Sequence, residues 1–206
     1  MSLPIPSRLR SLLLLAVLLA LLAPVAAPAR SLPNADFVVK KGKHDANGEG
    51  LRVHLVKIGQ RHDRRVSFKV LFTSSAAYTT PNPANQADDN KVMGISLMRI
   101  HEDSIRLGWS WDPQHKLMNL AYYGWVNGMP DRQDLTTVPL NTWVDCEIRM
   151  NDHGLSVKVN GASKERKVEL GWKGTTTTAI LRTAYFGGTS VAPQDIEVKV
   201  KDISAD

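Results

Sequence analysis

The chain has 206 residues, of which 26 are lysine or arginine and 20 are aspartate or glutamate, so its net charge is +6. The positive excess is spread along the sequence and does not form the basic stripe typical of nucleic-acid-binding proteins, so no nucleic-acid partner is expected. Cys146 is the only cysteine, which excludes an internal disulfide and leaves stability to a hydrophobic core.

The first 29 residues have the pattern of a secretory signal peptide. Arg8 and Arg10 form a basic start, Leu12–Leu22 is apolar, and Ala27–Ala29 has the small residues of a cleavage site. The apolar run is shorter than the ~20 residues that a spanning helix needs. We therefore expect cleavage after Ala29 and a secreted or periplasmic product that is free of the membrane. An uncleaved N-terminal anchor is the alternative.

Residues 30–206 are expected to form one all-β domain. Apolar and polar residues alternate with a period of two in many short segments, as in half-buried strands, and Gly, Asn, Asp and Pro separate these segments. About ten such strands predict an antiparallel two-sheet β-sandwich of jelly-roll type. The expected strands cover residues 36–40, 51–58, 65–72, 92–101, 104–111, 117–126, 142–150, 154–160, 178–186 and 195–201.

Residues Ser74–Asn90 interrupt this alternation with a long polar loop. Asp88, Asp89 and Asn90 at its end carry oxygen atoms of the kind that Ca²⁺ binds. Three adjacent residues fall short of the roughly six to eight ligands that calcium takes, so a solvated acidic loop is expected. The sequence predicts no metal site and no cofactor.

The two strands after this loop are expected to pair as a hairpin that turns at Glu102–Asp103. In that register Ile100 faces Ile105 in the core, while Arg99 faces Arg106 on the outer face. Like charges directly opposite each other destabilise a sheet unless an anion lies between them. The arginine pair therefore predicts a position for an anionic group.

Three of the 5 tryptophans and two of the 4 tyrosines lie within residues 107–128. A turn at Asp112–His115 sends Trp109, Trp111 and Tyr122 into the core, with Trp109 opposite Met118. Large aromatic side chains dominate the burial energy of small domains, so burial is the expected role of these three.

The other side chains of the aromatic strand lie on its outer face. Asn119, Tyr123 and Trp125 have the opposite parity and share that face with Arg106 and His101. Gly108, expected beside Asn119, leaves a shallow groove. Aromatic faces next to guanidinium and amide donors suit a sugar ring that carries a carboxylate or sulfate. Alternatively, the Ser74–Asn90 loop folds over this face and buries it. The candidate ligand-binding residues are Arg99, His101, Arg106, Asn119, Tyr123 and Trp125.

A second hairpin is expected to turn at Asn151–Gly154. Its register pairs Cys146 with Val159 in the core and Glu147 with Lys158 outside. Cys146 is therefore expected to be a buried structural thiol and not a nucleophile.

Three segments resemble the concanavalin A-like jelly-roll sandwiches of lectins, laminin-G-like modules and alginate-lyase-like polysaccharide lyases. They are PLNTWVDCEIRMNDHGLSVKVNG (Pro139–Gly161), the aromatic pair LGWSWDPQHKLMNLAYYGWVNG (Leu107–Gly128) and TAYFGGTSVAPQDIEVKV (Thr183–Val200). The last is similar to a closing segment of uncharacterised secreted bacterial jelly-roll proteins. Together these segments cover about the C-terminal half, and none is a catalytic signature, so the resemblance implies a fold more than a function.

The resemblance implies a polysaccharide or other glycan as partner. Alginate-lyase-like enzymes use a Tyr/His pair, an Arg, and a Gln or Asn that neutralises the uronate carboxylate. Their strand motifs "R.ELR" and "Q.H" are absent, and Arg99–His101 (RIH) matches the second only in part. If the lyase chemistry were present, Tyr123 or His101 would remove the proton, while Arg99 and Asn119 would stabilise the enolate.

We therefore expect a noncatalytic module that binds an acidic glycan or acts in extracellular recognition. A polysaccharide lyase that cleaves a uronic-acid polymer by β-elimination is the first alternative. A structural protein of the cell envelope without a small ligand is the second. The sequence contains no HExxH, GxSxG or phosphate-loop motif.

Overall fold

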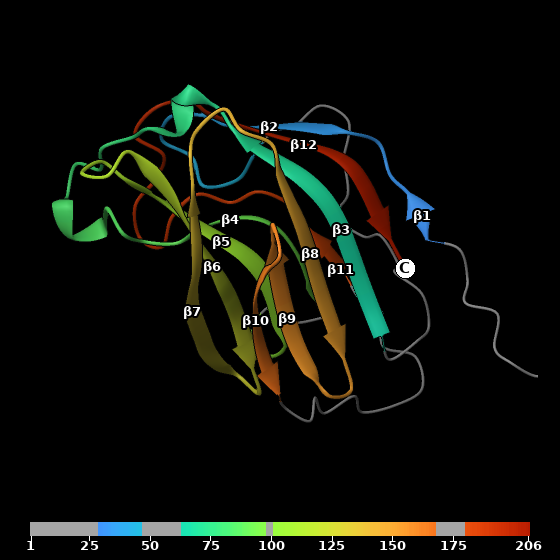
Figure 1. Cartoon of the computed structure of the whole chain (residues 1–206). Helices are drawn as coiled ribbons and strands as arrows, with labels where there is room; N and C mark the ends of the chain where they lie inside the picture. Colours follow the sequence, from blue (N-terminus) through green and yellow to red (C-terminus); the bar gives the residue numbers. More distant parts are fainter. Residues whose placement is uncertain (1–28, 47–62, 98–100, 168–179) are drawn as a thin grey trace, which may run out of the picture.

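The computed structural model describes residues 29–46, 63–97, 101–167 and 180–206 (Figure 1). The expected signal peptide and the strand expected at 51–58 lie outside these residues, apart from Ala29. The described elements are β1 (Arg30–Ser31), β2 (Ala35–Val39), β3 (Asp63–Phe72), η1 (Ser74–Ala76), η2 (Pro83–Asn85), β4 (Asn90–Ser96), β5 (Ser104–Asp112), β6 (Leu117–Val126), β7 (Met129–Val138), β8 (Val144–Asn151), β9 (Gly154–Val159), β10 (Ala162–Lys167), β11 (Ile180–Arg182) and β12 (Ile196–Ala205).

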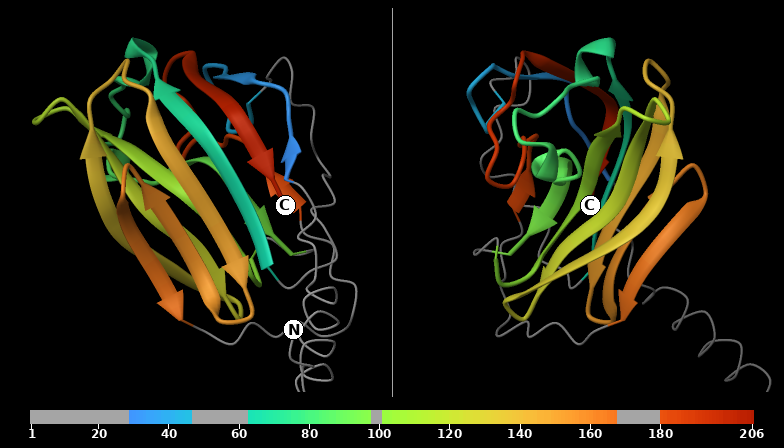
Figure 2. Two further views of the ribbon diagram at one scale, coloured as in Figure 1. Left: turned by 45° about the vertical axis from the view of Figure 1, so that its right-hand side comes forward. Right: turned by 90° about the vertical axis from the view of Figure 1, so that its left-hand side faces the viewer.

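These strands form two antiparallel sheets packed face to face, as Figure 2 shows. The seven-stranded sheet has the order β1-β12-β3-β8-β9-β10, with β2 also paired to β12. The five-stranded sheet has the order β11-β4-β5-β6-β7. The predicted antiparallel β-sandwich is confirmed. None of the helices in the described part of the chain is long and apolar enough to cross a membrane.

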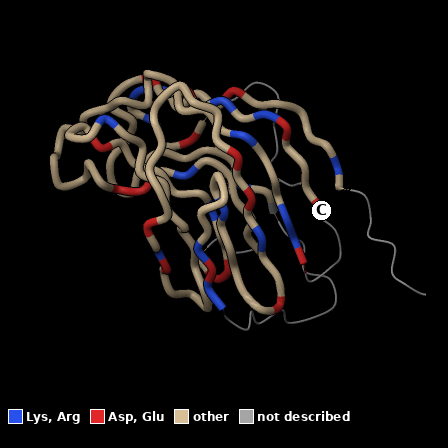
Figure 3. The backbone as a smooth tube through the Cα atoms, viewed as in Figure 1, with Lys and Arg blue, Asp and Glu red and all other residues tan. Residues whose placement is uncertain are grey.

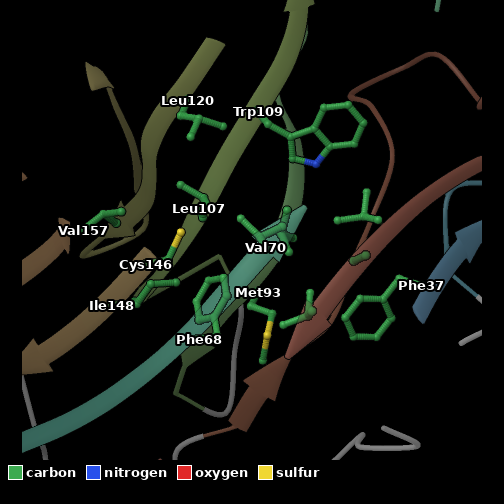
Figure 4. Packing of buried hydrophobic residues seen from close by; sticks show 14 of the residues in the cluster. Phe37, Phe68, Val70, Met93, Leu107, Trp109, Leu120, Cys146, Ile148 and Val157 are labelled. Atoms are coloured by element: carbon green, nitrogen blue, oxygen red, sulfur yellow. The ribbon is translucent and has the colours of Figure 1, made fainter. Parts of the chain in front are cut away.

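The alternating pattern of the sequence places one apolar face of each sheet in the shared core (Figure 4). Phe68 of β3, Leu107 and Trp109 of β5 and Cys146 of β8 meet between the layers. Cys146 is 5% exposed, and burial raises the pKa of its thiol. The predicted buried position of this cysteine is confirmed, and a thiol with a raised pKa is a poor nucleophile.

The β8–β9 hairpin has the predicted register. Cys146 lies opposite Val159 inside, Glu147 lies opposite Lys158 outside, and Asn151 lies opposite Gly154 at the turn. Apolar side chains on one face fix this pairing, because a slip by one residue would turn all of them toward solvent.

Three described edge strands, β1, β7 and β10, were not predicted from the sequence, and two other strands end earlier than expected. β7 is polar and contains Pro130, and β10 is almost entirely charged or exposed. Edge strands tolerate proline and charge because one side needs no hydrogen-bonding partner, so they lack the alternation that marks a strand. The strand expected at 178–186 ends at Arg182 in β11, and the one expected at 92–101 ends at Ser96.

The Ser74–Asn90 loop is built into the fold through buried polar contacts. Tyr78 packs edge-on against Trp109, and Gln86 Nε2 donates hydrogen bonds to the carbonyl oxygens of Tyr78 and Trp111. Asp89 is 9% exposed, and its Oδ2 accepts a hydrogen bond from Arg132 Nε at 2.6 Å. The expectation of a solvated acidic loop is therefore wrong for Asp89, which forms an ion pair that joins the loop to β7.

Candidate functional site

The β4–β5 hairpin is paired in a different register from the predicted one. Arg106 lies opposite Gly94, and Ile105 lies opposite Ile95. The connection is longer than a two-residue turn, since Leu97 N donates to the Asp103 carbonyl at 3.0 Å. The predicted pairing of Arg106 with Arg99 is therefore wrong, and Arg99 itself lies outside the described residues.

Gly94 explains why the arginine fits at this position. A Cβ atom on Gly94 would lie 2.5 Å from Cγ of Arg106 and 2.2 Å from the Ile105 carbonyl oxygen. No real Cβ is found so close to other atoms, so the arginine side chain requires a glycine opposite it. The prediction missed this pairing because it placed a two-residue turn at Glu102–Asp103, which sets a different register.

The β5–β6 hairpin is shifted by two residues from the predicted register. Trp109 lies opposite Leu120 instead of Met118, and Asp112 lies opposite Leu117. A shift of two preserves which side chains point inward. Trp109 and Tyr122 are therefore buried as predicted, at 2% and 0% exposure.

The same shift places the predicted outer-face residues in new pairs. Arg106 faces Tyr123 directly, Ser104 faces Trp125, and Asn119 faces Ser110 rather than lying beside Gly108. The outer face of the five-stranded sheet is hollowed into an open groove of about 640 Å³. The described residues that line the groove are Asp45, Ala46, Lys91, His101, Ser104, Arg106, Tyr123, Trp125, Leu181, Arg182, Thr183, Ala184, Tyr185, Gly187 and Gly188.

Four of the six candidate residues therefore line one groove: His101, Arg106, Tyr123 and Trp125. The rings of His101 and Trp125 are 4.7 Å apart. Asn119 is on the same sheet but is not among the lining residues. No residue of the Ser74–Asn90 loop lines the groove, so the alternative in which this loop folds over the groove is not supported.

A second wall of the groove comes from the segment after β11, which the sequence analysis had assigned to a strand without a site. Lys91 N donates to the Tyr185 carbonyl at 2.8 Å, and Tyr185 N donates to the Lys91 carbonyl at 2.9 Å. The His44 ring stacks on Tyr185 at 5.3 Å. In the sequence, Tyr185–Gly188 was singled out only as part of the Thr183–Val200 segment that resembles other jelly-roll proteins. Its role as a wall of the groove depends on the pairing of Tyr185 with Lys91 of β4, which is distant in the sequence.

A buried amide anchors this wall. Asn90, at 0% exposure, accepts a hydrogen bond from Gly187 N at 2.5 Å and donates one to Tyr78 Oη at 2.9 Å. Gly187 has a φ of +72°, and a Cβ there would lie 2.2 Å from the Ser190 carbonyl oxygen. Asn90 and Gly187 together hold the Tyr185 segment against the start of β4.

Lys91 is a buried cation that the sequence analysis did not single out. Its side chain is 7% exposed, and its Nζ donates to the Asp89 carbonyl at 2.7 Å. The same nitrogen lies 4.2 Å from the centre of the Tyr123 ring and 5.7 Å from that of Tyr185. Burial, and then the positive charge of Arg106, lower the pKa of Lys91 to about 8.

Arg106 is the second buried cation of the groove. It is 7% exposed, and its Nη2 donates to the Thr183 carbonyl at 2.7 Å. Its Nε is buried without a hydrogen-bond partner. Burial, and then the charge of Arg182, lower the pKa of Arg106 to about 10. Among the described residues no carboxylate forms an ion pair with Arg106 or Lys91.

This set of side chains is suited to an anion. Within the described ranges, no group of three or more His, Cys, Asp or Glu side chains lies close enough to hold a metal ion. Buried cations with free hydrogen-bonding capacity attract carboxylates, phosphates or sulfates. The adjoining aromatic rings offer apolar faces beside that charge.

No protein family model and no curated protein matches the chain. Solved structures of alginate lyases do resemble it. One from Pseudomonas aeruginosa has a TM-score of 0.53 and 11% identity, covering 71% of this chain and 65% of its own. Alginate lyase AlyC3 has a TM-score of 0.56 and 10% identity, with coverages of 84% and 74%. The family 18 polysaccharide lyase aly-SJ02 has a TM-score of 0.51 and 6% identity, with coverages of 84% and 87%.

The chain thus spans slightly under two thirds of the Pseudomonas aeruginosa enzyme. At such low identities the likeness concerns the fold, because activity depends on particular side chains in a site. The resemblance expected from the sequence is confirmed at this level. The chain therefore has the concanavalin A-like jelly-roll β-sandwich fold that these alginate lyases share.

Proposed function

We propose that the groove binds a segment of an acidic polysaccharide. The observation that carries this proposal is Arg106, which is almost wholly buried, has an unpartnered Nε and has no ion-pair partner among the described residues. A buried charged donor without a hydrogen-bond partner is unfavourable in the free protein. A ligand carboxylate that accepts a hydrogen bond from Arg106 would remove this unfavourable free energy and thereby favour binding.

The aromatic residues support a sugar ligand over a small inorganic anion. Tyr123 and Trp125 are half-buried neighbours of Arg106 on the groove floor, and Tyr185 forms part of the wall. Aromatic faces cover the apolar C–H face of a sugar ring, while the arginine binds its acidic group. An open groove of about 640 Å³ on a sheet face can receive a segment of a polymer.

The fold likeness points to the same ligand class. Alginate lyase AlyC3 has been solved in complex with dimannuronate, and that complex has a TM-score of 0.56 to this chain. A polysaccharide lyase is therefore a second candidate function, and the buried Lys91 in the groove favours it. The fold likeness gives no support to the expectation of a noncatalytic module. The absence of the strand motifs "R.ELR" and "Q.H" is a difference between this chain and alginate-lyase-like enzymes.

A thermal shift experiment tests the binding proposal. The melting temperature of the wild type is measured with polymannuronate, polyguluronate, polyglucuronate and a neutral cello-oligosaccharide. We expect at least one polyuronate, and not the neutral glycan, to raise the melting temperature. Arg106→Gln should abolish the shift, while Arg149→Gln, on the outer face of the other sheet, should retain it.

Two results would contradict the proposal. If no polyuronate shifts the wild-type transition, the groove does not bind this ligand class, and the envelope-protein alternative gains support. If the shift survives in Arg106→Gln, binding occurs elsewhere on the molecule. Export of the chain, which would place it near extracellular polysaccharides, remains a prediction from its first 29 residues.

A further inference from the structure

We infer that Lys91 is the proton acceptor of a β-elimination reaction in this groove, an inference that rests on the proposed binding of a uronate polymer. The sequence analysis assigned that role to Tyr123 or His101. The structure places Lys91, and not His101, beside the arginine that would hold the carboxylate.

The position of Lys91 matches what a base requires. Its Nζ lines the groove, is screened from bulk water and uses one donor position on the Asp89 carbonyl. A neutral amine has one lone pair that is free to accept a proton. Arg106 approaches from the adjacent strand, so a sugar carboxylate bound there would bring its α-carbon near Lys91. His101, by contrast, is exposed, and its ring is tilted against that of Trp125.

Burial and the nearby charges enlarge the neutral fraction of Lys91 near neutral pH, while its protonated form predominates below about pH 8. Burial and the charge of Arg106 on β5 lower its pKa, while Asp89 and then Asp88 on the preceding loop act in the opposite direction, leaving it at about 8. Tyr123 on β6 and Tyr185 on the second wall face it with their rings. A base whose pKa is close to the working pH is both available and strong enough to remove a proton.

The proposed step balances as follows. The C5–H bond of the uronate breaks, its proton moves to the neutral Lys91 amine, and its electron pair forms the C4–C5 double bond. The C4–O bond breaks, and the leaving oxygen takes a proton from a tyrosine hydroxyl of the groove, which solvent then restores. Arg106 stabilises the negative charge that develops on the carboxylate. Lys91 finally releases its proton to water.

Lys91→Arg and Lys91→Met provide the test, with Lys69→Arg on the outer face of the seven-stranded sheet as the control. Arginine keeps the positive charge but does not deprotonate. Formation of unsaturated uronate from polymannuronate, polyguluronate and polyglucuronate is followed by ultraviolet absorbance, and polymer binding by the thermal shift. Circular dichroism shows whether each variant folds.

We expect wild-type kcat/KM to rise with pH up to about pH 8, which is where Lys91 loses its proton. Lys91→Arg should bind the polymer but lose about 10²-fold or more in kcat, the usual contribution of a general base. The Lys69→Arg control should retain both properties.

The possible failures are distinguishable. Unsaturated product formed by Lys91→Arg at the wild-type rate, or by Lys91→Met if the arginine variant does not fold, would overturn the role of Lys91 and leave binding intact. A wild type that binds polyuronates but forms no unsaturated product overturns the inference alone. A wild type that neither binds nor cleaves overturns the proposed function as well.

Discussion

Lys91 and Arg106 are two buried cations of the groove, and burial lowers the pKa of both. Each is 7% exposed, and the positive charge of Arg106 contributes to the lowered pKa of Lys91. Buried charges without a paired carboxylate cost folding free energy. Functional sites are where proteins retain such unfavourable arrangements, which is a physical reason to place the ligand here.

The lowered pKa of Lys91 predicts a specific dependence of stability on pH. Between about pH 8 and the ordinary value of 10.5, the unfolded chain keeps the Lys91 proton while the folded chain has lost it. The unfolded state then binds more protons, so stability increases with pH. We expect the unfolding free energy of the wild type to rise relative to that of Lys91→Met across this window, as measured by urea titration. A constant difference would contradict the lowered pKa.

Trp109 and Trp125 lie on opposite faces of the five-stranded sheet, so their replacement should have different consequences. Trp109 is 2% exposed and packs against Phe72 and Tyr78, whereas Trp125 is half-buried in the groove. Trp109→Ala should destabilise the protein by about 3–5 kcal/mol, as expected for a buried aromatic truncation. Trp125→Ala should cost clearly less but weaken glycan binding. Equal losses in a urea titration would mean that Trp125 also belongs to the core.

At the scale of elements, the pairing of β4 with β5 creates the groove floor. In this pairing Gly94, and not Arg99 as predicted, faces Arg106. β11 then pairs with the other edge of β4, placing Arg182 opposite Gly94. One glycine thus lies between two strands that each supply an arginine to the groove.

Gly94→Ala should test this arrangement. The new methyl group would collide with the Ile105 carbonyl and the Arg106 side chain, so we expect a loss of about 1–3 kcal/mol in unfolding free energy, typical of overpacking. Polyuronate binding should fall too, because Arg106 must move. Gly108→Ala is the matched control, since its Cβ would meet Tyr123 Cβ at 3.2 Å, a milder contact. If Gly94→Ala is as mild as the control, the described register is wrong.

At the scale of the molecule, basic and acidic residues are interspersed along strands such as β3, β8 and β12, whereas β6 carries no charged residue (Figure 3). The outer face of the seven-stranded sheet carries exposed ion pairs such as Arg65 with Asp206 at 2.9 Å. Exposed pairs of this kind add little stability. The unpaired positive charge that distinguishes one face lies instead in the groove, with Lys91 and Arg106.

This distribution predicts how polyuronate binding responds to salt. Screening shortens the reach of charge from about 8 Å at physiological ionic strength to about 3 Å at 1 M. We therefore expect the dissociation constant for a polyuronate, measured by calorimetry, to rise as sodium chloride is added. An affinity that is unchanged between low salt and 1 M would mean that stacking and neutral hydrogen bonds dominate, and the charge-based account would be wrong.

The sequence by itself determined the fold class, the β8–β9 hairpin and the division of the aromatic residues between core and face. These features depend on a period-two pattern, and burial of apolar side chains makes that pattern nearly unavoidable. Cys146 and Trp109 are in the core for this reason. The edge strands β7 and β10 were beyond this reasoning, because exposed edges carry no apolar pattern.

Only the tertiary structure decided the composition of the groove. Lys91, Arg182 and Tyr185 join Arg106 and Tyr123 because β11 and the segment after it return to β4 from about 90 residues away along the chain. Local sequence patterns carry no information about such long-range pairing. From the local pattern alone, a polar residue in a strand is predicted to face solvent, even where a distant segment of the folded chain covers it. The lowered pKa values of Lys91 and Arg106 have the same origin, since they depend on burial that the sequence alone does not reveal.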